Sequence, residues 1–532
     1  MKRAHLSVPA GIILFMLGAA IAGAGPRADN GGRADTAGSG QAAGQPRDGG
    51  QLVIALAAIP RSLDPIQYTG VYESDIIGNV ADTLVEYTMD LSDIVPNIAT
   101  SWTASANGIE YTFKLRDDVY FHNGRKLIAD DVKFSLERSA KESAMGRLSM
   151  LDRVDVISPT EVKCVLKTAN AAFVTALTDQ GNVIIPREEV DRLGDKFGTA
   201  LVGTGPFVLK EWHADESVVL ARNDRYWGQR PHLDGIIYRF ITDNNMMATA
   251  LRSGEIHIAT DLNGENIKVV QDDRNVIYKD VAGLQISYFY LNLQEGPTKD
   301  IRVRRAILSA INVDEMVQGL YRYGQGQRAY IPLPPGSWGY DKSLESTFPA
   351  YNPTEAKRLL TEAGYPNGFD TEIYITDNQV RINAATIIQK YLKDNLNINV
   401  QIKTSEWGAF SAIGAGGKAP IYGMSWTWYP DPYFFLNNLF HSGQIGSLGN
   451  GQGFNMPEMD ALLDKASSAG ALEERAGYYK QALKLASEQL PMLVYVNEKA
   501  TYGFSPKVQD FVLRADKKNV FVSESINVWL SE

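Results

Sequence analysis

The stretch with the most chemistry-bearing side chains runs from Met424 to Phe435, where tryptophan, tyrosine and phenylalanine surround Pro430, Asp431 and Pro432. Aromatic rings offer large rigid faces to a ligand, and the two prolines restrict the backbone that carries them. The segment is therefore a candidate wall of a binding pocket. A core segment that ends in a proline-stiffened turn has the same composition, and the sequence leaves both interpretations open.

Residue patterns that would indicate catalysis or a bound cofactor are missing from the sequence. The six histidines lie far apart, there is no HExxH or GxSxG motif, and Cys164 is the only cysteine. Gly417-Lys418 resembles the end of a phosphate-binding loop, but Ala419 follows where Ser or Thr is required. We therefore expect no catalytic residues, no metal site and no cofactor, and we expect Cys164 to be a buried structural thiol.

The first 24 residues have the pattern of a secretory signal peptide. Lys2 and Arg3 precede an apolar stretch, residues 11–21, which is too short for a stable membrane span, and Ala22-Gly23-Ala24 supplies small residues for cleavage. No cysteine follows that could carry a lipid. An unanchored exported protein is retained only behind an outer membrane, so we expect the periplasm of a Gram-negative cell.

The elements that must position the aromatic segment follow an α/β pattern. A chain of 532 residues needs more than one hydrophobic core. Residues 25–50 are poor in large apolar side chains and are expected to form a disordered linker. After Gln51, strand and helix patterns alternate, with helices expected at 130–138, from Pro353 onward and around 387–396, the last followed by a strand at 398–402. The net charge of −10 argues against nucleic acid as a partner.

Several different short motifs follow one another along the chain, each occurring once. They are Ser62-Leu63-Asp64-Pro65, Leu84-Val85-Glu86, Tyr111-Thr112-Phe113-Lys114, Phe121-His122-Asn123-Gly124, Gly203-Thr204-Gly205-Pro206-Phe207, Arg222-Asn223-Asp224-Arg225-Tyr226-Trp227 and Asp300-Ile301-Arg302-Val303-Arg304. In this order and spacing, from about Gln51 to Val522, the chain resembles the family 5 extracellular solute-binding proteins, which include dipeptide-, oligopeptide- and nickel-binding members.

The resemblance implies an α/β, two-lobed periplasmic binding protein ("flytrap") fold with an extra subdomain in lobe I. Mapped onto this sequence, lobe I comprises residues 51–282 and 501–532, and lobe II comprises residues 285–499. The hinge strands would be 284–291 and 493–496, which also have strand composition. The implied function is that of a monomeric receptor that captures a small solute and delivers it to separately encoded permease and ATPase subunits of an ABC importer.

The resemblance also implies ligand-contacting residues. In lobe I they follow the Leu-Asp-Pro block, and in lobe II they include two tryptophan blocks and an arginine near the place where dipeptide binders anchor a carboxylate. The candidates are Tyr68, Thr69, Gly70, Val71, Arg381, Trp407, Trp426, Trp428, Tyr429 and Asp431. A core role for Trp407 or Trp426, and a surface role for Arg381, stay open.

One departure from the family pattern concerns the ligand's amine. Peptide-binding relatives carry an Asp three residues after the second tryptophan, which holds the free α-amine of the peptide. Here that position falls on Trp428 or Tyr429, and Asp431 belongs to an Asp-Pro pair with the pattern of a structural turn. We therefore expect the amine anchor to be missing or relocated, which suits an N-blocked peptide, an opine, a sugar conjugate or another amphipathic solute.

Two other classes of function remain open. One is a periplasmic enzyme such as a peptidase, which would yield products from a peptide mixture where a receptor would not. The other is a signalling or chaperone-like module on the same fold. Neighbouring permease and ATPase genes would favour transport over that alternative.

Overall fold

The computed structural model describes residues 45–427 and 429–532. The predicted signal peptide, most of the predicted linker and Trp428 lie outside the described residues. The last residues of the predicted linker contact folded chain: Asp48 forms an ion pair with Arg230 and a hydrogen bond with His232 Nδ1, and the Gly49 N–H donates to the His232 carbonyl at 2.8 Å. Among the described residues, no helix has the length and apolar character to cross a membrane.

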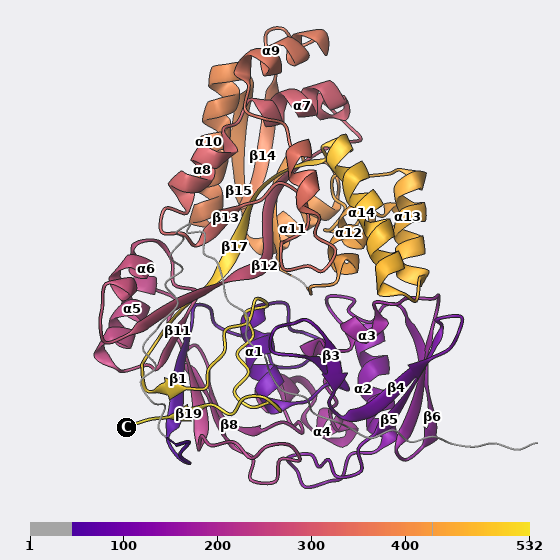
Figure 1. Ribbon diagram of the computed structural model, residues 1–532, viewed down its shortest axis with the longest axis vertical. Coiled ribbons are helices and arrows are strands. Elements are labelled where there is room, and N and C mark those ends of the chain that lie inside the picture. The colour runs from indigo at the N-terminus through magenta and orange to yellow at the C-terminus, as the bar shows by residue number, and fades with distance from the viewer. Residues whose placement is uncertain (1–44, 428) are drawn as a thin grey trace, which may run out of the picture. The chain divides into compact units, whose positions relative to one another are not determined.

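A single mixed sheet of 11 strands runs through both lobes (Figure 1). In spatial order it contains β15 (Asn399–Ser405), β14 (Asp370–Thr376), β16 (Ile421–Thr427), β12 (Ile277–Leu291), β17 (Met492–Phe504), β11 (Ile258–Thr260), β1 (Gln51–Leu56), β10 (Gly235–Phe240), β9 (Ser217–Arg222) and β8 (Phe207–His213), and β13 (Gly326–Arg328) pairs with β17. The strands β12 and β17 are the longest and pass from one lobe into the other.

In lobe II the sheet is buried on both faces, because successive residues of β12 enter different cores. Phe289 and Leu291 pack with the helices of one face, whereas Tyr288 and Tyr290 pack with those of the other. The first face carries α7 (Ile301–Ser309), α8 (Val313–Leu320), α9 (Pro353–Glu362) and α10 (Gln379–Leu396), and the second carries α11 (Trp407–Ala415), α12 (Pro432–Phe440), α13 (Pro457–Ser468) and α14 (Leu472–Gln489).

Lobe I repeats this arrangement with fewer helices. Leu52, Ile54 and Leu56 of β1 share a core with α1 (Val71–Val80), while Ala55 shares one with α5 (Asn244–Ser253) and α6 (Gly264–Gln271). The remaining short elements of this lobe are α4 (Arg187–Leu193) and the two-stranded pairs β2 (Val85–Tyr87) with β3 (Ile94–Pro96) and β18 (Val508–Gln509) with β19 (Trp529–Leu530).

A separate four-stranded sheet builds the subdomain of lobe I. Its order is β4 (Ala99–Ala104), β5 (Glu110–Leu115), β7 (Glu161–Leu166) and β6 (Leu151–Ser158), packed against α2 (Ala129–Glu142) and α3 (Phe173–Ala176). Cys164 on β7 is buried in this core, and burial raises the pKa of its thiol. It is therefore a structural thiol, as its strand context predicts.

Local sequence patterns predicted several of these elements. The helix expected at 130–138 lies within α2, and α9 begins at Pro353 with the Asn352 side chain accepting the Glu355 N–H at 3.1 Å. Proline at the first helical position after an Asn cap is a common helix start. The expected helix at 387–396 and the strand after it are α10 and β15.

The crossing of β12 and β17 is irregular where the lobes meet. Their register shifts between Ala282 and Gln285, so that Gly283 and Leu284 have no ladder partner on β17. A Cβ atom at Gly283 would lie 2.3 Å from the Glu498 carbonyl oxygen, closer than any side chain tolerates. Glycine therefore allows the two strands to approach each other at this bulge. Both strands are longer than the segments expected for the hinge.

Candidate functional site

The lobe II candidates gather at one edge of the sheet because three of its strands are parallel. β14 pairs in parallel with β15, with Thr376 opposite Ser405, and with β16, with Tyr374 opposite Tyr422. Their carboxyl ends therefore lie side by side, and each leads into a helix: α10, α11 and α12 respectively. In α/β sheets this edge is where ligands bind.

The edge also favours negative charge. The first turns of α10, α11 and α12 leave backbone N–H groups there that their own helices do not use. The aligned peptide dipoles make a helix N-terminus partly positive, which attracts anionic groups. Asn378, Glu406 and Asp431 cap the three helices, each accepting at least one N–H through its side chain.

Arg381, in the first turn of α10, adds a full positive charge. Its guanidinium donates to Thr376 Oγ1 at 2.9 Å and to Ser425 Oγ at 2.6 Å. Both partners are neutral, and no carboxylate of the described chain lies within ion-pair distance of it. The arginine is thus oriented by two hydroxyls while its charge stays available for an anionic partner.

Asp431, in contrast, is engaged by partners from both lobes, since Thr175 Oγ1 of lobe I also donates to its carboxylate at 3.5 Å. It is 2 % exposed, its carboxylate accepts the Tyr433 N–H at 3.0 Å, and Arg475 Nη2 lies 2.8 and 3.1 Å from its two oxygens. The Arg475 guanidinium also stacks on Trp338, 5.1 Å from the ring centroid. Releasing this carboxylate toward an amine would leave Arg475 buried without its counter-ion.

The aromatic candidates differ in what they offer. Trp407, the first residue of α11, is 51 % exposed and contacts Phe410, so one face of its indole is free to stack with a solute. Trp426 lies on β16 opposite Ile286 and is half-buried. Tyr429 is in edge contact with Phe434, at 4.8 Å between centroids. Trp428 lies outside the described residues.

In lobe I the candidates also follow a strand whose neighbours are parallel. β1 pairs in parallel with β10 and β11, and the chain then leads to Gly70, the cap of α1. Thr69 is exposed and Val71 begins the helix. Tyr68 is buried: its hydroxyl donates to Asp179, and a guanidinium lies over its ring. Tyr68 thus anchors the segment in the interior of lobe I, whereas Thr69, Gly70 and Val71 are at least partly exposed.

Charged groups of lobe I act on residues of the lobe II site. The Lys518 ammonium of the C-terminal segment lies 5.6 Å from the Tyr429 ring centroid. The N–H groups of Gly408 and Ala409, and to a smaller extent Arg61 of lobe I, hold the pKa of Glu406 below its ordinary value. The charge of Arg61, in the loop after β1, therefore acts on the start of α11, where Trp407 is exposed.

A model of the bacterial extracellular solute-binding proteins, family 5, matches residues 93–447. The chain belongs to this family. Its two-lobed α/β fold, predicted from motif order, is confirmed by solved family structures.

Relatives of this family 5 solute-binding protein cover nearly all of its length. It is 29 % identical to heme-binding protein A of Haemophilus influenzae, across 84 % of this chain and 87 % of the relative. It is 26 % identical to the dipeptide-binding protein of Escherichia coli, across 89 % and 94 %. The ABC transporter-associated periplasmic binding protein DppA from Helicobacter pylori, solved with the peptide STSA, is 30 % identical with a TM-score of 0.80, across 91 % and 99 %.

The solute-binding protein also has a polar network at the hinge that its sequence did not indicate. Glu498 on β17 accepts from Ser287 Oγ at 3.0 Å, and Lys517 pairs with Asp261 at 2.9 Å, to which Tyr72 also donates. Burial alone would lower the pKa of Lys517, but Asp261 and Glu498 raise it above its ordinary value. No motif marks these residues; the only available signal was the proximity of Glu498 to the second hinge strand.

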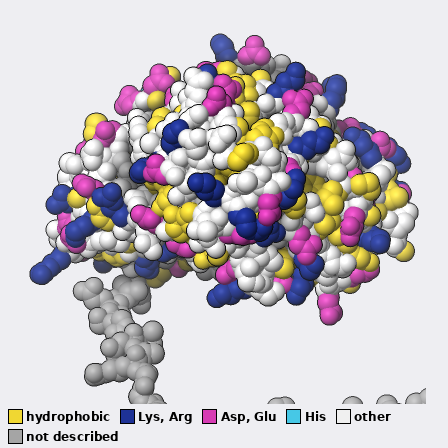
Figure 2. All heavy atoms as spheres, turned by 90° about the horizontal axis from the view of Figure 1, so that it is seen from above, with side chains coloured by type: hydrophobic (Ala, Val, Ile, Leu, Met, Phe, Trp, Pro, Cys, Tyr) yellow, Lys and Arg dark blue, Asp and Glu magenta, His cyan; other side chains and the backbone are white. Residues whose placement is uncertain are grey.

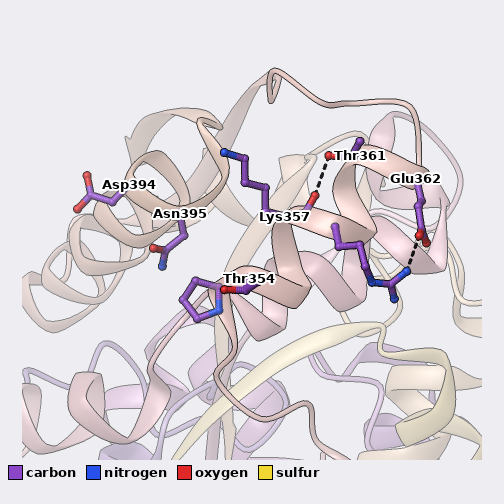
Figure 3. Close-up of a pocket in the computed structure, with 8 residues that line it drawn as sticks. Thr354, Lys357, Thr361, Glu362, Asp394 and Asn395 are labelled. Atoms are coloured by element: carbon purple, nitrogen blue, oxygen red, sulfur yellow. Dashed lines mark hydrogen bonds and ion pairs between the residues drawn. The ribbon is translucent and has the colours of Figure 1, made fainter.

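A surface hollow of about 550 Å³ lies elsewhere, between α9 and α10 (Figure 3). Thr354, Lys357, Glu362 and Asp394 are among its lining residues. Asp394 is 13 residues beyond Arg381, which places it about 20 Å farther along the helix axis. Figure 2, the view from above Figure 1, shows acidic and basic side chains interspersed over that face, without a broad patch of one sign. We assign no function to this hollow.

Proposed function

We propose that this chain is the receptor component of an ABC importer, which encloses a solute between its lobes and delivers it to separately encoded permease and ATPase subunits. Its family consists of extracellular solute-binding proteins, and the relatives compared are named for binding heme or peptides. We also propose that the chain catalyses no reaction and acts in the periplasm.

The export part of the proposal predicts the N-terminus of the mature protein. N-terminal sequencing of the protein from a periplasmic extract should begin at Gly25, and an intact Met1 in a membrane pellet would contradict export.

The edge of lobe II supports a solute that carries a carboxylate and an apolar face. Arg381 has neutral partners only, the N-terminus of its helix α10 is capped by the neutral Asn378, and Trp407 is exposed at the start of α11. The decisive observation is that Asp431, the first acid after the family's amine position in the sequence, is held by Arg475 and by the start of α12. The solute is therefore anchored through its anionic group, without an α-amine salt bridge at this place.

Calorimetry with matched peptides tests this ligand class. N-acetylated peptides are expected to bind as well as their free-amine counterparts or better, because an ammonium buried without a carboxylate costs several kcal/mol. Amidation of the C-terminal carboxylate, Arg381→Gln and Trp428→Ala are each expected to weaken binding, the first two at least tenfold. Arg305→Gln removes the same charge from an exposed position on α7 and serves as the control.

A strong preference for the free amine that disappears in Asp431→Asn would overturn this assignment. It would restore a peptide receptor whose amine anchor has shifted to Asp431. If no peptide binds, the solute that copurifies with the protein, identified by mass spectrometry, supplies the matched pair in which the carboxylate and amine are blocked in turn.

A further inference from the structure

Lobe I contains an internal cavity of about 70 Å³ that is lined mainly by polar side chains. It lies along α1, whose first residues are ligand candidates, and is closed by the segment after α1 and by the C-terminal segment. The lining includes Asp75, Asp82, Glu86, Asn97, Lys518 and Asn519. A polar space of this size holds several waters or the head group of a small ligand.

Three hydrogen-bond acceptors of this cavity have no donor in the described part of the chain. Asn519 is 3 % exposed and donates through Nδ2 to Asp75 at 2.7 Å, which leaves its Oδ1 unpartnered. Asn97 is buried, and its side chain forms no hydrogen bond with described residues. Glu86 forms neither a hydrogen bond nor an ion pair with them. Of these three, the Asn519 oxygen is inaccessible to solvent, and a buried acceptor without a donor is rare in folded proteins and indicates a missing partner.

The other charged groups of the cavity are already satisfied. Asp82 accepts from Thr204 Oγ1 at 2.8 Å and from Trp227 Nε1 at 3.0 Å. Arg514 forms a bidentate pair with Asp516, and the Lys518 ammonium donates to Gln180 and lies over the ring of Tyr429. Each of the three residues therefore has a side-chain oxygen that accepts no hydrogen bond, and one of them is a carboxylate, while Asn97 also has an amide NH₂ group without a partner among the described residues.

We propose that this cavity binds a primary ammonium group at the end of an alkyl chain of the solute, held by the Glu86 carboxylate and by the side-chain oxygens of Asn97 and Asn519. An ammonium has three N–H donors, which matches the three free acceptors. The group is distinct from the α-amine discussed above, because the cavity lies in lobe I. Assigning the ammonium to the captured solute rests on the proposed function, whereas the affinity of the cavity for an ammonium ion does not.

The ionisation of Glu86 fits this assignment. Burial, with a further contribution from Asp82, raises the pKa of Glu86 to about 7, while Arg514 opposes the rise and Glu524 adds to it. Near neutral pH the empty cavity thus holds a partly protonated carboxyl. A bound ammonium would replace that proton as the positive partner.

The test uses methylammonium chloride as the probe and the solute-free protein. A crystal grown with methylammonium is expected to show the ion within hydrogen-bond distance of Glu86 and Asn519, whereas tetramethylammonium, which has the same charge and no N–H group, is excluded. In titrations, affinity should rise about tenfold from pH 6 to pH 8 as Glu86 ionises, since methylammonium stays charged throughout. Glu86→Gln should weaken binding at least tenfold.

The matched control is Glu524→Gln, which removes an exposed carboxylate whose charge also acts on Glu86; it should change affinity less than twofold. Water alone in the cavity, equal binding of tetramethylammonium, or equal losses in the two variants would each overturn the proposal. Because the crystal experiment uses the unmodified protein, a folding defect in Glu86→Gln does not obscure the result. Failure here leaves the carboxylate and N-acetyl tests of the solute unaffected.

Discussion

Replacing Asp431 with Ala is expected to lower the free energy of unfolding by about 3–5 kcal/mol, because the change leaves the Arg475 guanidinium buried without its counter-ion. The side chains of Asp431 and Arg475 are 2 % and 9 % exposed, so solvent screening offers little compensation. The same substitution removes the side-chain cap of α12, which costs about 1 kcal/mol on its own. Urea-induced unfolding, followed by far-UV circular dichroism, measures the change.

Two further variants separate the ion pair from the cap. Asp431→Asn retains an oxygen that can cap α12 but removes the charge, so it should lose most of the stability that Asp431→Ala loses. Combining Asp431→Asn with Arg475→Met removes both charges and should recover much of that loss, since replacing a buried pair as a whole is far less costly than breaking it. A stability loss below about 1 kcal/mol in Asp431→Ala, together with lost solute binding, would instead identify Asp431 as a ligand anchor.

The structural role of Asp431 could be predicted in part because part of it is local. An Asp followed by Pro is the pattern of a helix N-terminus, and α12 begins at Pro432. The ion pair with Arg475 could not be predicted, because the two residues are 44 positions apart and meet only when α12 packs near α14. The sequence therefore indicated a structural pattern at Asp431 but also left it among the ligand candidates, and it did not indicate how firmly the side chain is held.

The same distinction applies to the candidate site. The positions after β14, β15 and β16 could be located because the resemblance to the family implies the chain topology, and parallel strands bring their carboxyl ends together. Motif order does not determine which side of a loop faces inward: Tyr68 was grouped with Thr69, but its hydroxyl reaches Asp179, 111 residues away. The cavity near Glu86 depends on Asn519, whose partner Asp75 is 444 residues away, so no local pattern could indicate it.

Where the lobes touch outside the hinge, two adjacent residues of lobe II have different surroundings. Phe434 is 8 % exposed and packs into the core of the lobe I subdomain, together with Tyr429 and Tyr433 from its own lobe. Phe435 is fully buried in the core of lobe II. Nearby, the Ala171 N–H of lobe I donates to the Ser467 carbonyl of lobe II at 2.7 Å. Lobe II thus packs the Phe434 ring, with Tyr429 and Tyr433 beside it, against the core of the lobe I subdomain, while the Phe435 ring lies in the core of lobe II.

Phe434→Ala is therefore expected to weaken lobe closure more than folding. Truncating a buried Phe costs about 3–5 kcal/mol in a core. In Phe435→Ala that cost should appear in the free energy of unfolding. In Phe434→Ala much of it should fall on the arrangement in which the lobes touch, because Phe434 can separate from lobe I without unfolding either lobe. The population of separated lobes should rise, and solute affinity should fall at least tenfold, since a solute that contacts both lobes must then supply the closure energy itself.

Small-angle scattering of the solute-free variants, paired with urea unfolding, distinguishes the two outcomes: a larger radius of gyration with near-normal stability is expected for Phe434→Ala, and the reverse for Phe435→Ala. If both variants unfold with equal ease and neither changes its radius of gyration, Phe434 is an ordinary core residue and does not control closure.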